Sequence, residues 1–236
     1  MIRGENLKKT FGDQLVFENV SFVIPDGEIV GFYGSSGIGK STLAKVLCGI
    51  KKPDEGAVYL DDELLYSANT PYDRKKGLQI QMVYQQPYAS LDHSQKLIKG
   101  FYELIRYHHF AANKSEADRL IRELMDEVGL NMEILNHLPH QISGGEAQRI
   151  AIARCLLFKP KLLILDEATS MLDVSTQANV LALVRRVMKK HGGSVLLISH
   201  DRELVEYLCD RLYVFERCHL KYKDNAKWRK QNDKKR

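Results

Sequence analysis

The stretch GSSGIGKST, residues 34–42, decides the fold of this 236-residue chain. It satisfies the pattern GxxxxGK[ST], in which glycines let successive backbone N–H groups turn toward one anion. The lysine of such a loop reaches the β- and γ-phosphates of a nucleotide, and the hydroxyl that follows it binds Mg²⁺. We therefore predict that a nucleotide binds to Gly34, Ser35, Gly37, Gly39, Lys40, Ser41 and Thr42.

The segments on either side of this loop have the expected character. The short apolar run EIVGFY (residues 28–33) predicts a buried strand. After the loop, Leu43, Val46 and Leu47 recur at helical spacing, and Gly49 is the expected end of that helix. A loop between a strand and a helix N-terminus adds the partial positive charge of the helix to the anion site.

A second polar feature follows the apolar run LLIL, residues 162–165, which reads as a strand buried on both faces. Asp166 and Glu167 come directly after it. Ligands of α/β sheets gather at the carboxyl ends of strands, so the two acids are expected near the phosphate loop. Asp166 is suited to holding Mg²⁺ through water, and Glu167 to polarising an attacking water. The alternative is a pair of solvated acids at a strand end.

The rest of the chain reads as an α/β core interrupted by a helical insertion. Between residues 87 and 141 the apolar positions recur at helical spacing, with Ser115 and Asp118 as the expected cap of one helix. Ser143 and Glu146 have the S-x-x-E spacing of a capping box, so a helix is expected to begin at Ser143. Further strands are expected at 2–8, 16–24, 79–85, 194–198 and 212–215, and helices at 174–191 and 201–209.

Composition and charge narrow the class of protein. No run approaches 18 consecutive apolar residues, and the N-terminal residues lack the apolar region of a secretory signal. The four cysteines have no CxxC spacing, which argues against a zinc site and favours a reducing compartment, the cytoplasm. The net charge is +5, but residues 217–236 hold nine Lys/Arg against two Asp. We expect this segment to be a basic tail, either solvated or in contact with anionic lipid or nucleic acid.

Together with the motifs that follow, the phosphate loop and the two acids make residues 1–216 resemble the ATP-binding cassette (ABC) ATPases. ISGGEAQR (142–149) resembles the signature motif of that family, and its Ser143 lies 23 residues before Asp166. Four further matches follow in the order expected for the family: Phe11 as the aromatic under the adenine, Gln85 as the Q-loop, Ser170–Asp173 as the D-loop and His200 as the switch histidine.

The resemblance implies an α/β fold of the P-loop NTPase class, ABC ATPase type. It would have a RecA-like parallel-sheet core, an antiparallel β subdomain and an inserted α-helical subdomain at about 87–158. It also implies ATP and Mg²⁺, with the metal held by Ser41, Gln85 and Asp166. Glu167, His200 and Gln85 would be the catalytic residues. Asp173 of the D-loop would also bind nucleotide. Ser143, Gly144 and Gly145 would contact the nucleotide bound by a second cassette, so that each signature motif is half of a site completed by another polypeptide.

Single residues retain simpler interpretations. Phe11 could instead be a core aromatic near a strand end, because buried phenylalanine is common. His200 could be a histidine satisfied by its neighbours, and Gln85 an ordinary loop amide. If Gln85 is functional, its place before the helical insertion makes it a candidate hinge.

The passage QMVYQQPYASLDH (81–93) resembles the ATPases of dipeptide, oligopeptide and nickel importers, in particular the second, smaller ATPase of such systems. This implies transmembrane permease subunits, a second ABC ATPase, identical or not, and indirectly a solute-binding protein as partners. The location would be the cytoplasmic face of the membrane, and no nucleic acid is expected. Two alternatives stay open: an ABC ATPase that acts on nucleic acid or ribosomes through the basic tail, and an ordinary P-loop kinase or GTPase.

Overall fold

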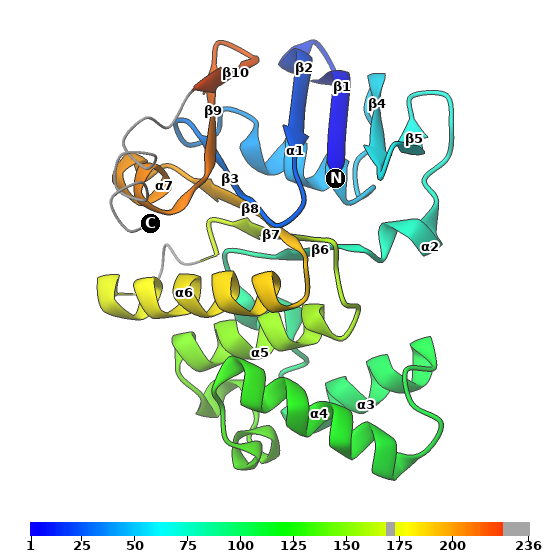
Figure 1. The fold of residues 1–236 in the computed structure, drawn as a ribbon, viewed down its shortest axis with the longest axis vertical. Helices are drawn as coiled ribbons and strands as arrows, with labels where there is room; N and C mark the ends of the chain where they lie inside the picture. The colour runs from blue at the N-terminus through cyan, green and yellow to red at the C-terminus, as the bar shows by residue number, and fades with distance from the viewer. Residues whose placement is uncertain (169–172, 224–236) are drawn as a thin grey trace. The chain divides into compact units, whose positions relative to one another are not determined.

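A six-stranded sheet carries the strand that leads into the phosphate loop. The computed structural model describes residues 1–168 and 173–223 (Figure 1). The strand order is β10-β9-β3-β8-β7-β6. The bounds are β3 (Ile29–Tyr33), β6 (Ile80–Val83), β7 (Leu162–Asp166), β8 (Ser194–Ser199), β9 (Arg211–Glu216) and β10 (His219–Lys223). β3 runs parallel to β8 and β9, and β7 runs parallel to β8, whereas β10 is antiparallel to β9. Every residue of β7 and of β8 is buried, as the apolar run at 162–165 predicts.

A second sheet of four strands is antiparallel. Its order is β2-β1-β4-β5, with β1 (Ile2–Phe11), β2 (Gln14–Ile24), β4 (Glu55–Leu60) and β5 (Glu63–Ser67). The β4–β5 hairpin was not among the individually predicted elements. Its turn is Asp61-Asp62, with φ of 51° and 63°, a conformation for which Asn-Gly is the usual sequence signal.

One hydrophobic core joins both sheets to the helix α1 (Lys40–Leu47). It includes Ile2, Phe17 and Phe22 from the antiparallel sheet, Phe32, Leu162 and Leu196 from the six-stranded sheet, and Leu43 and Leu47 from α1. The ring of Phe32 meets those of Phe22, Tyr213 and Phe215 edge-on. α1 ends at Leu47, and Gly49 follows with φ of 68°, as expected of a residue that ends a helix. This packing fixes α1, and with it the phosphate loop, against the sheet.

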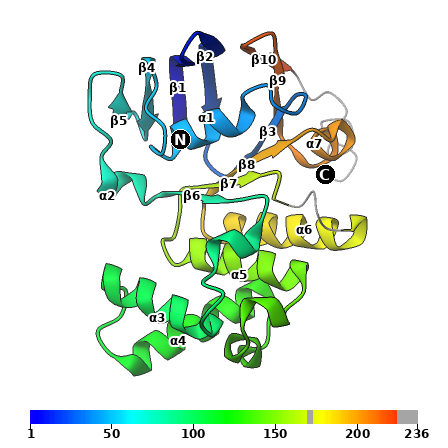
Figure 2. The same cartoon turned by 180° about the vertical axis from the view of Figure 1, so that it is seen from behind.

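The described residues form two compact units. The first comprises Met1–Met82, Pro160–Glu167 and the chain from Met188 onward, and it also contains α2 (Arg74–Gly77) and α7 (Arg202–Leu208). The second comprises Val83–Lys159 and Ala168–Val187. Its helices are α3 (Leu97–His108), α4 (Lys114–Val128), α5 (Gly144–Leu156) and most of α6 (Val174–Lys190), with the short helices η1 (Pro87–Ser90), η2 (Met132–Asn136) and η3 (Pro139–Gln141). Figures 1 and 2 both show α4 beside α3 and α5. The expected helical insertion 87–158 falls within this unit, and its exact bounds stay a prediction.

The structure corrects three sequence-based details. The cap of α4 is Asn113, whose side chain accepts a hydrogen bond from Glu116 N at 2.9 Å, and not Ser115, which lies inside the helix. The strand expected at 79–85 ends at Val83, so Gln85 lies in the connection after it. The tail expected from residue 217 includes the strand β10 at His219–Lys223, and residues 224–236 lie outside the described part of the chain. None of the helices described is both long and apolar enough to cross a membrane.

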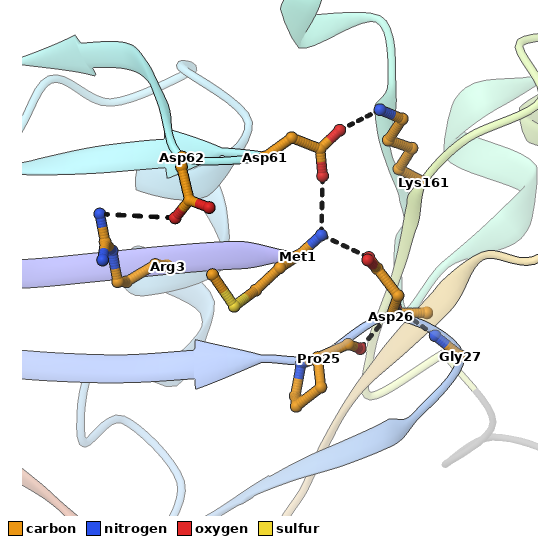
Figure 3. Close-up of polar contacts among 9 residues, drawn as sticks. Met1, Arg3, Pro25, Asp26, Gly27, Asp61, Asp62 and Lys161 are labelled. Atoms are coloured by element: carbon orange, nitrogen blue, oxygen red, sulfur yellow. Dashed lines mark hydrogen bonds and ion pairs between the residues drawn. The ribbon is translucent and has the colours of Figure 1, made fainter.

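A polar cluster joins three connections of the first unit (Figure 3). The amino group of Met1 contacts Asp26, in the β2–β3 turn, and Asp61, in the β4–β5 turn, the latter at 2.7 Å. Lys161, just before β7, also donates to Asp61, and this hydrogen bond is the main reason that the pKa of Asp61 is lowered. These groups are partly exposed, so each ion pair stabilises the fold by only about 0.2–1 kcal/mol.

Candidate functional site

The register of three parallel strands brings the polar residues of the first unit together. Phe32 of β3 and Asp166 of β7 both pair with Ile198 of β8, so the three strands end at nearly the same level. Gly34, Glu167 and His200 follow these strands directly and therefore leave the sheet at the same edge. This is the carboxyl edge at which α/β sheets bind their ligands.

The glycines of the phosphate loop have conformations that other residues would strain. Gly37 has φ of 78° and Gly39 φ of 115°. A Cβ added at Gly39 would lie 2.8 Å from Val16 Cγ1. Within the described residues no side chain caps α1, which begins directly after Gly39. The first-turn N–H groups of α1 therefore face the loop, as an anion site requires.

Lys40 is buried against its own loop. Its Nζ donates to the carbonyl oxygens of Gly34 and Ser35, at 2.7 and 2.8 Å, and lies 3.8 Å from Glu167 Oε1. The Lys40 side chain is 3% exposed, and burial lowers its pKa. A buried cation held by two neutral carbonyls and one carboxylate is well placed to exchange these partners for phosphate oxygens.

Ser41 and Asp166 form the second contact between the loop and the sheet. Ser41 Oγ donates to Asp166 Oδ1 at 2.8 Å. Asp166 is 7% exposed, and burial raises its pKa. A hydroxyl and a carboxylate are the oxygen ligands that Mg²⁺ takes from proteins when substrate phosphates and water complete its shell. The described residues contain no group of three or more His, Cys, Asp and Glu that could hold a metal ion.

Glu167 lies between the loop and the end of β8. Its Oε1 is 3.4 Å from His200 Nδ1, in addition to its 3.8 Å distance from Lys40 Nζ. Its backbone has φ of 48°, a left-handed conformation that is uncommon outside glycine and that clusters at functional sites. The Glu167 N–H donates to Ile198 O at 3.0 Å, which holds the residue in this conformation. His200 is 56% exposed, so a ligand could reach its ring, and its role stays a prediction.

Phe11 ends β1 and is 45% exposed, so it is not a core aromatic. The ammonium groups of Lys9 and Lys51 lie 5.7 and 5.6 Å from the centre of its ring. An exposed ring beside cationic side chains can stack on a base through its face, which binds without reading the edges of the base.

The second unit contains the remaining predicted residues. Ser143 caps α5 in a capping box: Glu146 N donates to Ser143 Oγ at 3.4 Å, and Glu146 Oε2 accepts from Ser143 N at 2.8 Å and from Ser143 Oγ at 2.7 Å. These hydrogen bonds lower the pKa of Glu146. The predicted capping box is thus confirmed.

The signature residues line an open groove of about 790 Å³ within the second unit. Ser143, Gly144, Gly145 and Glu146 line it, and so does Asp173. Hydrogen bonds from Thr176 and Ser175 hold the pKa of Asp173 below its usual range. Gln85 is exposed two residues after β6. Residues 170–172 of the expected D-loop lie outside the described residues.

The model of the ABC transporter family matches residues 17–170, which include the phosphate loop, the signature motif and the two acids at the end of β7. The chain belongs to the ABC transporter family. This ABC protein is an ATP-binding cassette ATPase, as the sequence motifs imply. The kinase or GTPase alternative is therefore wrong, and the nucleic-acid alternative is not favoured.

The curated relatives of this ABC protein are ATP-binding proteins of oligopeptide transport and of nickel import. It is 38% identical to the oligopeptide transport ATP-binding protein OppF of Streptococcus mutans over 84% of this chain and 64% of that protein. It is 37% identical to OppF of Bacillus subtilis over 89% of this chain and 70% of that protein. It is also 37% identical to the nickel import ATP-binding protein NikE of Escherichia coli K12, over 86% and 75%. The chain thus spans slightly less than two thirds of the first of these proteins.

Solved cassettes share the fold. The dimeric structure of MJ0796, a bacterial ABC transporter cassette, matches 96% of this chain and 99% of that one, at 27% identity and a TM-score of 0.81. The cbiO1 protein from Clostridium perfringens matches 98% and 91%, with a TM-score of 0.82. At 24% identity this second likeness shows the fold alone. The predicted ABC ATPase fold is confirmed.

Proposed function

We propose that this ABC ATPase powers the uptake of a peptide, nickel or a metal chelate through separate membrane subunits. The observation that carries the proposal is the 37–38% identity to oligopeptide and nickel import ATP-binding proteins over 84–89% of the chain. Sequence identity does not distinguish the two kinds of cargo, because the chain is 38% identical to OppF of Streptococcus mutans and 37% identical to NikE.

ATP binding in this proposal begins at the phosphate loop. The backbone N–H groups of residues 34–42 surround the phosphates, and Lys40 releases the carbonyls of Gly34 and Ser35 to contact the β- and γ-phosphates. Phe11 stacks on the adenine. A ring face discriminates weakly among bases, so most of the affinity comes from the phosphates.

Ser41 and Asp166 are the proposed Mg²⁺ ligands, and Gln85 stays a predicted one. The 2.8 Å contact between Ser41 and Asp166 supports this assignment, because one ion can accept both oxygens in place of their mutual hydrogen bond. When bound, Mg²⁺ neutralises phosphate charge and orients the γ-phosphate.

Glu167 and His200 are the proposed catalytic pair. Glu167 orients a water molecule and accepts its proton, while the water oxygen bonds to the γ-phosphorus and the bond to the bridging oxygen breaks. ADP leaves with the electron pair of that bond. His200 holds a γ-phosphate oxygen, and its contact with Glu167 at 3.4 Å keeps both groups at one end of the site.

The signature motif completes a site on a second cassette. Ser143 and Gly145 lie at the N-terminus of a 13-residue helix, which favours an anion, but the motif itself contains no lysine. We propose that Ser143, Gly144, Gly145 and Asp173 close over the γ-phosphate held by the Lys40-type loop of the other cassette. The dimeric state of the related cassette MJ0796 supports this arrangement.

Membrane permease subunits and a second ABC ATPase are the proposed direct partners, with a solute-binding protein acting indirectly. The subunit would then lie on the cytoplasmic face of the membrane. To test this, uptake of radioactive nickel and of a labelled oligopeptide is measured in cells that lack the chain. Wild-type protein should restore one of the two uptakes and Lys40→Ala should not. Unchanged uptake of both cargoes, with the chain co-purifying with ribosomes, would overturn the proposal.

A further inference from the structure

The peptide bond between Ile142 and Ser143, at the entry to α5, is held on both sides. Its carbonyl oxygen accepts a hydrogen bond from Tyr88 Oη at 2.9 Å. Its N–H donates to the Glu146 carboxylate at 2.8 Å. The C=O and N–H groups of one peptide lie in a single plane, so these two bonds together fix the orientation of the plane. The Ser143 N–H and the Ser143 side chain both move with it.

Hydrogen bonds also close the turn that contains Tyr88. Tyr88 belongs to the short helix η1, whose first residue, Pro87, is buried. Leu91 N donates to Tyr88 O at 3.0 Å and Ser90 Oγ donates to Pro87 O at 2.7 Å, which closes this turn. Leu91, directly after η1, is 8% exposed.

A second contact joins η1 to the other end of the same helix. Arg154, in the last turn of α5, donates from Nη1 to the carbonyl oxygen of Ser90. Burial lowers the pKa of Arg154. The segment 88–90 is thus attached to α5 both at its entry, through Tyr88, and at its end, through Arg154.

The short helix η1 lies close in sequence to Gln85 and contacts the peptide before Ser143. Gln85 lies three residues before Tyr88, and Ile142 lies directly before Ser143. All of these residues belong to the second compact unit. The hydrogen bond from Tyr88 to Ile142 therefore links the connection that contains Gln85 directly to the peptide before Ser143.

We propose that Tyr88 is a positioning residue for the signature motif: its hydroxyl sets the orientation of the Ile142–Ser143 peptide and so aims Ser143 at the phosphate of the partner-bound nucleotide. Tyr88 touches no reacting atom and acts through Ser143. The inference rests on the proposed role of Ser143 at a composite site. It adds that a displacement at Gln85 reaches Ser143 through η1.

The test compares Tyr88→Phe with Tyr102→Phe. Each variant removes one tyrosine hydroxyl from the second unit and leaves the ring in place. Tyr102 Oη donates to Asp118, from α3 to α4, and not to the segment that holds Ser143, so it is the matched control. The first readout is amide hydrogen exchange of the isolated chain. Residues 142–146 should exchange about three- to tenfold faster in Tyr88→Phe, the effect of losing one hydrogen bond, and at the wild-type rate in Tyr102→Phe.

The second readout is ATP hydrolysis by the chain assembled with its partner subunits. Tyr88→Phe should lower kcat about three- to tenfold and leave the KM for ATP unchanged, because the phosphate loop of residues 34–42 is not altered. A purely structural tyrosine would change the melting temperature of both variants alike and would spare kcat. Equal kcat values for wild type and Tyr88→Phe, or exchange at 142–146 equal to that of the control, would overturn the inference. If the assembled wild type does not hydrolyse ATP, the proposed function fails instead, while the exchange experiment still tests the hydrogen bond from Tyr88 to Ile142.

Discussion

Ser41 Oγ donates a hydrogen bond to Asp166 Oδ1 at 2.8 Å, although the two residues are 125 positions apart in the chain. Ser41 is the second residue of α1, and Asp166 is the last residue of β7. Their contact therefore joins the phosphate loop to the strand that ends in the two acids. It places a hydroxyl and a carboxylate where one Mg²⁺ ion could bind both.

Asp166→Asn should abolish the dependence of ATP binding on Mg²⁺. The amide keeps the size of the side chain but removes the charge that attracts the cation. ATP affinity of the isolated chain, measured with Mg²⁺ and with EDTA, should differ for wild type and be equal for the variant. Hydrolysis should fall at least about 100-fold. Asp62→Asn, at a side chain that is 71% exposed, is the control. An undiminished Mg²⁺ effect in Asp166→Asn would remove this residue from the metal site.

The same substitution should stabilise the protein when nucleotide and metal are absent. Burial raises the folded-state pKa of Asp166, so the fold prefers the neutral acid. That preference contributes stability below the unfolded pKa, near 3.9, and the contribution is lost as the pH rises through the folded value. At pH 7 the charged Asp166 opposes folding, and Asp166→Asn should melt at a higher temperature than wild type. Melting curves between pH 3 and 8 should show the gap closing in acid.

Glu167→Gln should separate ATP binding from hydrolysis. The amide can still lie near Lys40 and His200 but cannot accept the proton of the attacking water. Turnover in the assembled complex should fall about 100- to 10,000-fold, while the affinity of the isolated chain for ATP is retained. Glu203→Gln, an exposed acid in the first turn of α7, is the matched control. Turnover close to wild type in Glu167→Gln would show that another group accepts the proton.

Local patterns made much of this site predictable. The phosphate loop, the acids after an apolar strand and the S-x-x-E box each involve residues close together in sequence, and the hydrogen bonds of the box form as expected. The sequence did not predict which of two neighbouring polar residues caps α4. Asn113 and Ser115 can both cap a helix, and the cap is Asn113, whose side chain is in reach of Glu116 N.

Long-range contacts account for the rest. A hydrogen bond to Ile198 O of the neighbouring strand holds the left-handed backbone of Glu167. The residues next to Glu167 in the sequence do not predict this conformation. The bond from Tyr88 to Ile142 joins residues 54 positions apart. No periodic or compositional pattern in the sequence predicts either contact, because both depend on how segments far apart in the chain pack together.

Phe11→Ala should weaken ATP binding with little effect on stability. The ring is 45% exposed, so its removal leaves no large cavity. Loss of a stacked ring costs about 1–3 kcal/mol of binding free energy, which corresponds to an affinity lower by roughly five- to 150-fold. Phe11→Tyr should keep the affinity, since it retains the ring. Calorimetric titration of ATP checks this, with Tyr107→Ala, at a ring that is 78% exposed in the second unit, as control.

Glu146→Ala should destabilise the protein at neutral pH but not in acid. Hydrogen bonds from Ser143 lower the pKa of Glu146, so its contribution is present above the unfolded pKa, near 4.3, and lost as the pH falls through the folded value. Loss of the capping box costs about 1 kcal/mol, or roughly 2–4 °C in melting temperature. Melting curves at pH 7 and pH 3 test this, and an equal loss at both would assign the effect to something other than the charge.

Ser143→Arg should stop hydrolysis in the assembled complex and leave ATP binding to the isolated chain intact. The arginine fills the groove beside Gly144 and Gly145, where the phosphate of the partner-bound nucleotide is proposed to lie. The Lys40 loop is in the other unit and keeps its own contacts. Ser143 is a better position for this substitution than Gly145, because a Cβ at Gly145 would lie 3.0 Å from Thr176 Cγ2 and would also disturb the packing of α6.

The control for this last variant must account for the lost cap of α5. Asn113→Ala removes the corresponding cap of α4 in the same unit, so it should lower the melting temperature by a similar amount, about 1 kcal/mol in free energy. It should leave turnover unchanged, since α4 carries no signature residue. If both variants lost activity in proportion to stability, the effect of Ser143→Arg would be one of folding. If Ser143→Arg abolished ATP binding by the isolated chain, Ser143 would serve the nucleotide of its own chain, and the composite site would have to be abandoned.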